Sequence, residues 1–380
     1  MSEWEECKLG ELIDVKHGFA FKGEFFQTEP NENILITPGN FKIGGGWKED
    51  KCKYYNGKIP EDYILKAGDL IVTMTDLSKE VDTLGYSAIV PSDPNRTFLH
   101  NQRIGLIIQL NSDADLSFLN WLMRTPEYRF HVVSSASGST VGHTSPSRIK
   151  EYVFNLPPLP EQLAIASVLS CLDDKIDLLH RQNKTLEAMA ETLFRQWFVE
   201  EAEEGWEERC LGDVASFHNG KKRPDDIIEG NIPIYGGNGI LGYADKSNYE
   251  GVTVIIGRVG AYCGSLYIER NPVWISDNAL VAKPINKEHS SFLFFLLKSL
   301  QLNEMAEGSS HPLLTQTLLK SIQIILPPEH LIEPFVYQAD TWLNKFDKNN
   351  KQIRILEKLR DTLLPKLMSG EVRVEMEASS

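Results

Sequence analysis

The sequence has few cysteines, no long apolar run and no excess of basic residues. Its five cysteines are odd in number and none forms a CxxC pair, so neither a disulfide framework nor a zinc site is indicated. The longest apolar run, Phe292 to Leu297, is far shorter than the roughly 20 residues that a membrane span needs, and the charged first residues show no signal peptide. We therefore expect a reduced, cytoplasmic protein without a membrane partner.

The sequence motifs of common enzymes are absent as well. No glycine cluster forms GxGxxG between a strand and a helix, and neither a GK[ST] phosphate loop nor GxSxG occurs. The nine histidines show no HExxH or other metal-ligand spacing. The stretch NLPP at Asn155 is superficially like the Asn-Pro-Pro-aromatic loop of amino-methyltransferases, but a leucine interrupts it and no aromatic residue follows. The sequence predicts neither a catalytic site nor a metal site.

The formal net charge is −14, and it is unevenly distributed. Residues 151–205 carry 4 basic and 11 acidic residues, whereas residues 206–325 carry 11 basic and 13 acidic ones. This balance argues against a general DNA coat, because phosphate contacts need Lys and Arg. Local basic faces remain compatible with the composition.

Two parts of the chain repeat each other. WEECKLGEL from Trp4 matches WEERCLGDV from Trp206, 202 positions later. LPPLPE from Leu156 matches LPPE from Leu326, 170 positions later, and SFLNWL matches SFLFFL between them. Fixed offsets of this kind indicate an internal repeat. The order is a first module, a long helix, a second and shorter module, and a second long helix.

Each module mixes short strand-like runs, such as LKAGDLIVTM and GVTVIIGRVG, with helical segments, SFLNWLMRTPEYRFHVV in the first module and SFLFFLLKSL in the second. We therefore predict an α/β (α+β) fold in which two globular domains alternate with two helices, related by a pseudo-two-fold axis. The expected boundaries are 1–155 for the first module, 156–203 for the central helix, 204–325 for the second module, 326–371 for the C-terminal helix and 372–380 for a tail.

The two long helices carry apolar residues at alternating steps of four and three, the pattern of a coiled-coil seam. Pro160 and Glu161 suit the first turn of the central helix. The first seam is Ile165, Leu169, Leu172, Ile176, Leu179, Asn183, Leu186, Ala190, Leu193 and Trp197. The second is Phe335, Ala339, Trp342, Phe346, Asn349, Ile353, Leu356, Arg360, Leu363 and Leu367.

Each seam contains one asparagine. If the helices pair antiparallel with Ile165 opposite Leu367, then Asn183 lies opposite Asn349. Two asparagines that satisfy each other would fix the register of the pair. The alternative is that each asparagine is a partly exposed, solvated position.

Two similar loops precede the long helices, GSTVGHTSPSRIK from Gly138 and GSSHPLLTQTLLK from Gly308. Hydroxyl groups, backbone N–H groups and a helix N-terminus commonly bind phosphate, so these loops are candidate DNA contacts. An ordinary helix-capping loop is the alternative. The candidate residues are Ser139, Thr140, His143, Arg148, Ser309, Ser310 and His311.

Further candidates come from basic residues near turns. Lys221, Lys222 and Arg223 lie together and would grip phosphate or reach guanine, or form a solvated turn. Arg258 follows a strand and is flanked by glycines, which let another backbone approach. Weaker candidates of the same kind in the first module are Lys22, Thr73, Thr75 and Arg103.

The order of these parts, and above all LPPLPEQLAIASVL, GWEERCLGDV and LRDTLLPKLMSGEVRV, resembles the DNA specificity subunit of type I restriction–modification enzymes. The resemblance covers essentially the whole chain. It implies that each module reads one half of a split site on double-stranded DNA and that the helices set the spacing. It also implies docking of two methyltransferase subunits, which would carry S-adenosylmethionine, and a motor-nuclease subunit in the complete complex.

We therefore predict a non-catalytic DNA-reading subunit that binds no cofactor itself. The outer faces of the helices, including Trp197 and Phe198, are the predicted docking site for a methyltransferase. The alternatives are a stand-alone DNA methyltransferase or nuclease, and a coiled-coil scaffold that binds only proteins.

Overall fold

The computed structural model describes residues 4–50, 52–76, 78, 80–134, 142–224, 230–308 and 312–374. The chain forms two compact units. Unit 1 combines Met1–Asp177 with Arg354–Ser380, and unit 2 is Leu178–Ile353. The first module therefore lies in unit 1 and the second in unit 2.

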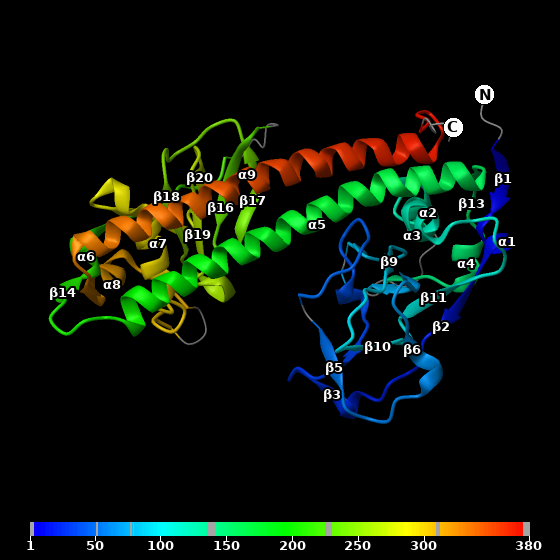
Figure 1. The fold of residues 1–380 in the computed structure, drawn as a ribbon, viewed down its shortest axis with the longest axis horizontal. Coiled ribbons are helices and arrows are strands. Elements are labelled where there is room, and N and C mark those ends of the chain that lie inside the picture. Colours follow the sequence, from blue (N-terminus) through cyan, green and yellow to red (C-terminus); the bar gives the residue numbers. More distant parts are fainter. Residues whose placement is uncertain are drawn as a thin grey trace. The chain divides into compact units, whose positions relative to one another are not determined.

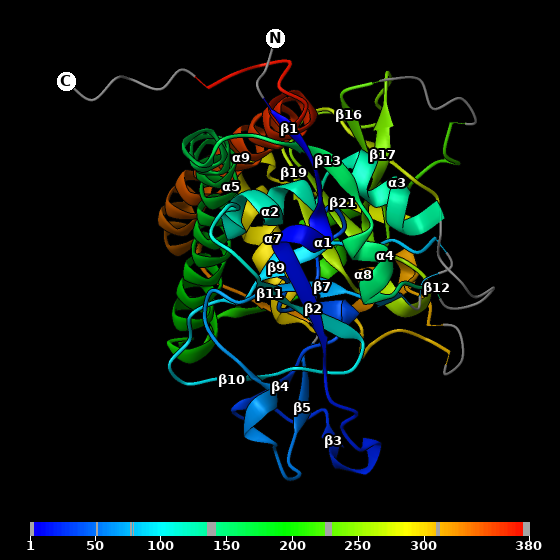
Figure 2. The same cartoon turned by 90° about the vertical axis from the view of Figure 1, so that its right-hand side faces the viewer.

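Unit 1 contains two main sheets. A four-stranded antiparallel sheet has the order β2-β11-β7-β9, and a five-stranded sheet has the order β3-β5-β4-β10-β6. The five-stranded sheet lies at the end of unit 1 away from the helices (Figures 1 and 2). The strands are β1 (Glu5–Lys8), β2 (Ile13–His17), β3 (Phe26–Gln27), β4 (Asn33–Leu35), β5 (Lys53–Tyr55), β6 (Ile64–Leu65), β7 (Leu70–Thr73), β8 (Thr75–Asp76), β9 (Ser87–Ile89), β10 (Thr97–Leu99), β11 (Ile104–Gln109), β12 (Gly142–His143) and β13 (Val153–Leu156).

Short helices connect these strands, with bounds α1 (Leu9–Leu12), α2 (Leu116–Leu122), α3 (Pro126–Ser134) and α4 (Pro146–Lys150). The side chain of Asp115 caps α2 by accepting the N–H of Phe118 at 2.8 Å. Pro126 begins α3, since proline suits a first helical turn. The helix predicted from SFLNWLMRTPEYRF is thus two helices with a break before the proline.

The core of unit 1 joins the four-stranded sheet to the long helices. Buried residues of β7 and β11 share one cluster with Phe118 and Trp121 of α2. The same cluster contains Ile165 and Leu169 from the first predicted seam and Leu367 from the second. The sheet, α2 and the long helices therefore share one continuous apolar core.

Unit 2 repeats this arrangement with fewer strands. Its four-stranded antiparallel sheet has the order β15-β21-β18-β19, and the second sheet has only three strands, in the order β17-β16-β20. The strands are β14 (Glu207–Cys210), β15 (Ala215–Asn219), β16 (Ile232–Gly236), β17 (Gly239–Ala244), β18 (Thr253–Gly257), β19 (Leu266–Glu269), β20 (Trp274–Ile275), β21 (Ala279–Pro284) and β22 (Gln323–Leu326).

The short helices of unit 2 follow the order of α1, α2 and α4 in unit 1. They are α6 (Leu211–Val214), α7 (Ser290–Ser299) and α8 (Gln316–Ser321). The fully apolar face of α7 buries Phe292 and Phe295 in one cluster with Phe194 and Phe335 of the long helices. A β1–β13 pair in unit 1 and a β14–β22 pair in unit 2 connect the start of each module to the strand that precedes its long helix.

The two long helices are α5 (Leu159–Arg195) and α9 (Glu329–Met368), and a π-helical turn, Gln196–Glu200, follows α5. Within unit 2 they run antiparallel, since Asn183 contacts Asn349 whereas Phe194, later in α5, contacts Phe335, earlier in α9. Figure 1 shows both helices, α5 in green and α9 in orange to red. The predicted mixed fold with repeated modules and long helices is confirmed.

Candidate nucleic-acid interface

Four segments meet at one edge of the four-stranded sheet in unit 1. The N–H of Phe19 donates to the carbonyl of His100 at 2.8 Å. The N–H of Met74 donates to the carbonyl of Arg103 at 2.9 Å, and the carbonyl of Met74 accepts the N–H of Thr144 at 3.0 Å. We call these segments, residues 18–22, 74–76, 100–103 and 142–145, loop cluster 1.

Unit 2 contains the same set of backbone hydrogen bonds. The N–H of Lys221 donates to Ile275 at 2.9 Å, the N–H of Arg258 donates to Asn278 at 3.0 Å, and Leu314 donates to the carbonyl of Arg258 at 3.0 Å. The corresponding segments, residues 220–224, 258–260, 275–278 and 312–315, form loop cluster 2. The match pairs Phe19 with Lys221, Met74 with Arg258 and Arg103 with Asn278.

A glycine makes the first contact possible in each cluster. A Cβ added at Gly18 would lie 2.1 Å from the carbonyl oxygen of Asn101, and one at Gly220 would lie 1.9 Å from that of Ser276. No other residue allows two backbones to approach so closely. The two glycines therefore fix the same geometry in both units.

Two predicted contacts in unit 1 are corrected by their burial. Thr73 is fully buried on β7, and its hydroxyl donates to the carbonyl of Thr83. Thr75 is 7% exposed, and its hydroxyl lies 3.2 Å from Nδ1 of His143, its partner across the β8–β12 pair. Both threonines hold the loops in place because their hydroxyls are used inside the protein, whereas His143 itself is exposed.

The basic candidates of unit 1 lie in three different settings. Arg103 lies in loop cluster 1 and is half-buried, without an ion-pair partner among the described residues. Lys22 is exposed, 3.8 Å from Glu24. Arg148 lies on α4, where it pairs with Glu151 at 3.3 Å. Only Arg103 and Lys22 therefore belong to the cluster.

All four basic candidates of unit 2 fall in loop cluster 2. Lys221 and Lys222 are exposed, and Arg223 approaches the carbonyl of Leu241 at 3.5 Å. Arg258 is half-buried, and its Nε is shielded from solvent without a hydrogen-bond partner in the part of the chain that the structure describes. The structure thus brings together basic residues that are separate in the sequence.

The remaining loop candidates cannot be placed. Ser139, Thr140, Ser309, Ser310 and His311 lie outside the described residues. Their neighbours His143 and Leu313 belong to loop clusters 1 and 2.

Asn183 and Asn349 meet inside unit 2, as the seam pattern predicts. Nδ2 of Asn349 donates to Oδ1 of Asn183 at 2.9 Å, and Nδ2 of Asn183 donates to Asn350 at 2.8 Å. Both residues are buried, with exposed fractions of 5% and 1%. The role of this contact in fixing the register stays a prediction.

The predicted docking residues have a different setting. The ring of Phe198 packs against Phe292 and Phe335 at 5.3 Å each, and Trp197 packs on the same core. The apolar seam passes from Ala190 to Phe194 rather than to Leu193, because a helix repeats every 3.6 residues. Trp197 and Phe198 therefore join the second module to α5 and do not form an outer face.

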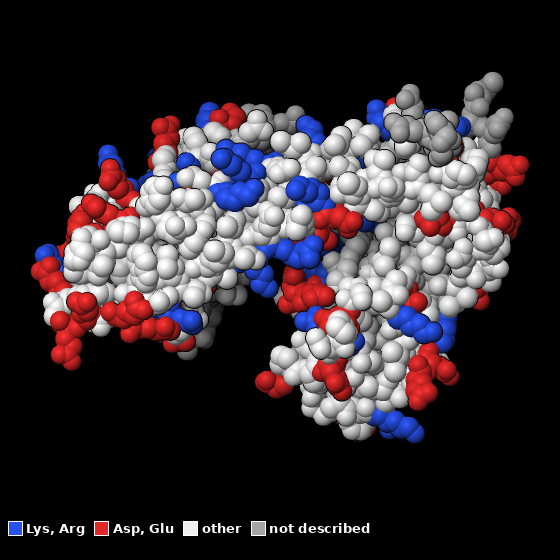
Figure 3. All heavy atoms as spheres, in the orientation of Figure 1, with Lys and Arg blue, Asp and Glu red and all other residues white. Residues whose placement is uncertain are grey.

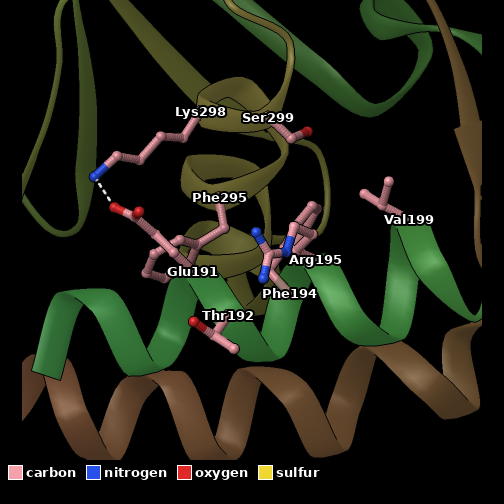
Figure 4. A pocket seen from close by; sticks show the side chains of 8 residues that line it. All are labelled: Glu191, Thr192, Phe194, Arg195, Val199, Phe295, Lys298 and Ser299. Carbon is pink, nitrogen blue, oxygen red and sulfur yellow. Dashed lines mark ion pairs between the residues drawn. The ribbon is translucent and has the colours of Figure 1, made fainter.

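A pocket of about 310 Å³ lies between α5 and α7 in unit 2 (Figure 4). Phe194 and Phe295 line it, and Lys298 at its edge pairs with both Glu187 and Glu191. Burial disfavours the charge of Lys298, but the two carboxylates outweigh this effect and raise its pKa. The charge of Lys298 is neutralised by Glu187 and Glu191 within the protein. We therefore interpret this pocket as part of the contact between the second module and α5.

Another part of the helix pair carries basic side chains. Figure 3 shows Lys and Arg gathered over the middle of α9. In unit 2, Lys345, Lys348 and Lys351 are exposed there and have no ion-pair partner among the described residues. Arg181 and Lys345 line a groove of about 370 Å³ with Leu178. This face is open to an acidic partner.

Within the described residues, no three His, Cys, Asp or Glu side chains lie close enough to hold a metal ion. None of the helices described combines the length and hydropathy that crossing a bilayer requires.

The sequence pattern named Arg103 as a candidate contact, but it did not single out Asn101 or the turn Ser276–Asn278 as part of the candidate interface. The available signal was the 202-position offset, which continues from the two tryptophans to Gly18 and Gly220. The turns themselves carry no such signal, because they lie far from these glycines in the sequence.

The sequence of the chain matches a known protein family. Residues 1–188 and 203–357 match the model of the family described as type I restriction modification DNA specificity domain. The chain is 27% identical over 299 residues to the type I restriction enzyme MjaIX specificity subunit of Methanocaldococcus jannaschii, covering 68% of this chain and 69% of that protein. It is 22% identical to the HindI specificity subunit of Haemophilus influenzae, covering 98% and 100%. The crystal structure of a type I S subunit from M. genitalium has a similar fold, with a TM-score of 0.64, 22% identity and coverage of 99% and 97%.

Proposed function

Because the chain belongs to the family of type I restriction modification DNA specificity domains, we propose that it selects the DNA sequence for a type I restriction–modification complex. In this proposal each loop cluster reads one half of a bipartite site on double-stranded DNA. The chain has no catalytic role of its own, and its cytoplasmic location stays a prediction.

The observation that carries the proposal is the duplication of the loop cluster. Both units present the same four segments, held by the same backbone hydrogen bonds, with different side chains on them. Phosphate and sugar contacts position a protein on DNA, whereas side chains at base edges specify the sequence. A repeated backbone with changed side chains is suited to reading two different half-sites.

The helices have two roles in this proposal. α5 and α9 each contribute to both units, so their length sets the number of unread base pairs between the half-sites. Their basic face, with the groove lined by Arg181 and Lys345, supplies a docking surface for two methyltransferase subunits. Those subunits would bind S-adenosylmethionine, and a motor-nuclease subunit would join for cleavage.

A heptad insertion tests the division of labour. Adding seven residues to both α5 and α9 at matched heights preserves the seam while it lengthens each helix by about 10 Å. The expected result is an unchanged pair of half-sites with about three more unread base pairs between them, since base pairs are 3.4 Å apart. Methylome sequencing of a host in which the variant complex is the only source of this methylation measures the half-site sequences and the number of unread base pairs.

The control is the wild-type chain in the same host, and a host without the chain should lose the methylation. New half-site sequences in the inserted variant would contradict the proposal. Methyl transfer by the purified chain alone would favour the stand-alone enzyme. A complex that binds the methyltransferase but retains no specific DNA would favour the protein-binding scaffold.

A further inference from the structure

We propose that the two loop clusters contribute unequally to DNA binding, with loop cluster 2 supplying most of the phosphate contacts. This inference rests on the proposed function and assigns the electrostatic part of it to one module.

The paired positions of the two clusters differ mainly in charge. Lys221 stands where unit 1 has Phe19, and Arg258 stands where it has Met74. The 202-position offset places Arg223 at the position of Phe21. Lys222 likewise stands at the position of Ala20. The reverse holds at two positions, where unit 1 has Arg103 and Lys22 and unit 2 has the uncharged Asn278 and Pro224. Four cations in loop cluster 2 thus correspond to uncharged residues, and the two cations of loop cluster 1 correspond to uncharged residues of loop cluster 2.

Two of these uncharged residues of loop cluster 1, Phe21 and Met74, are buried, whereas Phe19 is 36% exposed and packs on another aromatic ring. The ring of Phe19 lies 5.2 Å from that of Tyr63, and Phe21 lies 4.9 Å from Tyr55. Phe21 and Met74 are 6% and 3% exposed. The aromatic residues pack on the five-stranded sheet, which unit 2 replaces with three strands. Loop cluster 1 therefore uses these positions for packing and carries two cations, Lys22 and Arg103, where loop cluster 2 carries four.

The cations of loop cluster 2 are placed for an anionic ligand. The turn Ile275–Asn278 holds the backbones of both Lys221 and Arg258. Neither side chain has an ion pair in the described part of the chain. The guanidinium of Arg258 is partly desolvated, and its buried Nε has no acceptor among the residues that the structure describes.

A partly buried donor without an acceptor is unfavourable until a ligand supplies one. A phosphate does so well, because a guanidinium binds two of its oxygens at once. The repeated phosphates of a DNA strand meet both this requirement and that of the exposed Lys221.

The salt dependence of DNA binding measures the number of phosphate contacts. The slope of log K against log salt changes by about 0.9 for each contact with duplex DNA. In the assembled complex with its methyltransferase subunits, K221Q/R223Q/R258Q should lower the magnitude of this slope by about 2–3. The matched variant R103Q in loop cluster 1 should lower it by about 1 at most. Fluorescence anisotropy with a duplex carrying the methylated site supplies both slopes.

Neutral methylphosphonate linkages in one half-site or the other give a second readout. They should weaken wild-type binding strongly in one half only. The same linkages should have little further effect on the triple variant, since its contacts are already lost. An equal loss from both halves would overturn the proposal.

Two other outcomes also decide the question. An unchanged salt slope in the triple variant, with an altered half-site sequence, would mean that these cations read bases and would overturn the phosphate assignment alone. Absence of sequence-selective binding by the wild-type complex would instead contradict the proposed function. Far-UV circular dichroism and co-purification with the methyltransferase subunits establish that each variant is folded.

Discussion

Units 1 and 2 share a backbone plan and differ in the side chains placed on it. The order of the four-stranded sheet is the same, and the loop clusters have the same backbone hydrogen bonds. Backbone groups and two glycines, Gly18 and Gly220, fix the loops in both cases. Because the backbone hydrogen bonds and the glycines recur in both units, many of the side chains on the loops can differ between the units. The comparison shows how one repeated fold can carry two different surfaces.

The start of each long helix shows a second difference. In unit 1 the buried amide of Gln162 donates to the carbonyls of Asp113 and Pro157 and accepts the N–H of Asp115. At the corresponding position unit 2 has Ile332, which cannot make these hydrogen bonds. Ile332 lines a pocket of about 550 Å³ instead. The second unit is therefore less tightly closed at its helix entry.

The ion pairs that fasten each module to the helices are a third difference. In unit 1, Asp173 of α5 binds Arg124 at 3.0 Å and Arg360 at 2.6 Å, and the Arg124 side chain is only 5% exposed. In unit 2, Arg270 binds Asp340 at 2.9 Å, and the Asp340 side chain is 38% exposed. Burial favours protonated Asp173, but the two arginines outweigh it and lower its pKa.

The largest expected effect is at this buried ion-pair network. Replacing Asp173 with Asn leaves the buried Arg124 without its carboxylate and Arg360 with Asp361 alone, which should lower the free energy of unfolding by about 3–5 kcal/mol. Asp340→Asn in unit 2 should cost at most about 1 kcal/mol, since its ion pair is more exposed. Urea unfolding followed by circular dichroism compares the two variants. Equal costs for the two variants would show that the ion pairs contribute equally to the stability of the two units.

The asparagine pair of unit 2 should have an intermediate effect. Asn183→Leu leaves the buried Nδ2 of Asn349 without its 2.9 Å acceptor, at a cost of about 1–3 kcal/mol. Asn183→Leu/Asn349→Leu removes both polar groups and should cost less than the single change. Thermal unfolding of both variants tests this order. A double variant with the summed cost of its two single variants would show that the two asparagines do not depend on each other.

A smaller effect than at Asp173, and one that depends on pH, is expected at Asp347. Burial raises the pKa of Asp347 to about 6 from 3.8, with Arg270 acting in the opposite direction. The folded chain therefore holds this proton more tightly than the unfolded chain, so stability declines as the pH rises from about 4 through about 6. Asp347→Asn removes this decline.

The variant should gain about 1–2 kcal/mol relative to the wild type between pH 4 and pH 7.5. Urea midpoints at the two pH values measure the gain. Asp173→Asn should show the opposite pH dependence. The lowered pKa of Asp173 stabilises the fold above about pH 4, and this contribution is lost as the pH falls. A stability difference between Asp347→Asn and the wild type that does not change with pH would contradict the assignment.

Much of the fold is predictable from local patterns. Apolar residues at steps of three and four predict α5 and α9, and the recurrence of Trp4 at Trp206 predicts the second module. The predicted strands around Ile71 and Val254 are β7 and β18. These features depend on periodicity and repetition, which a single sequence displays directly.

The candidate interface is predictable only in part. Arg258 and Lys221 are visible as basic residues near glycines, but their meeting at one turn depends on strands far apart in the sequence. Thr73 is a residue type that often contacts DNA, but it lies in the core. Which face of a strand is buried depends on the sheets that pack on it. The burial of the Phe198 ring likewise depends on the packing of α7, whose Phe292 it contacts.

By itself, the sequence determined the repeat, the two long helices and the seam that brings Asn183 to Asn349, because these follow from spacing along the chain. The tertiary structure alone decided which side chains remain at the surface of each loop cluster. The physical reason is that burial is set by neighbouring elements, so equivalent positions can hold a buried Met74 in one unit and a half-buried Arg258 in the other.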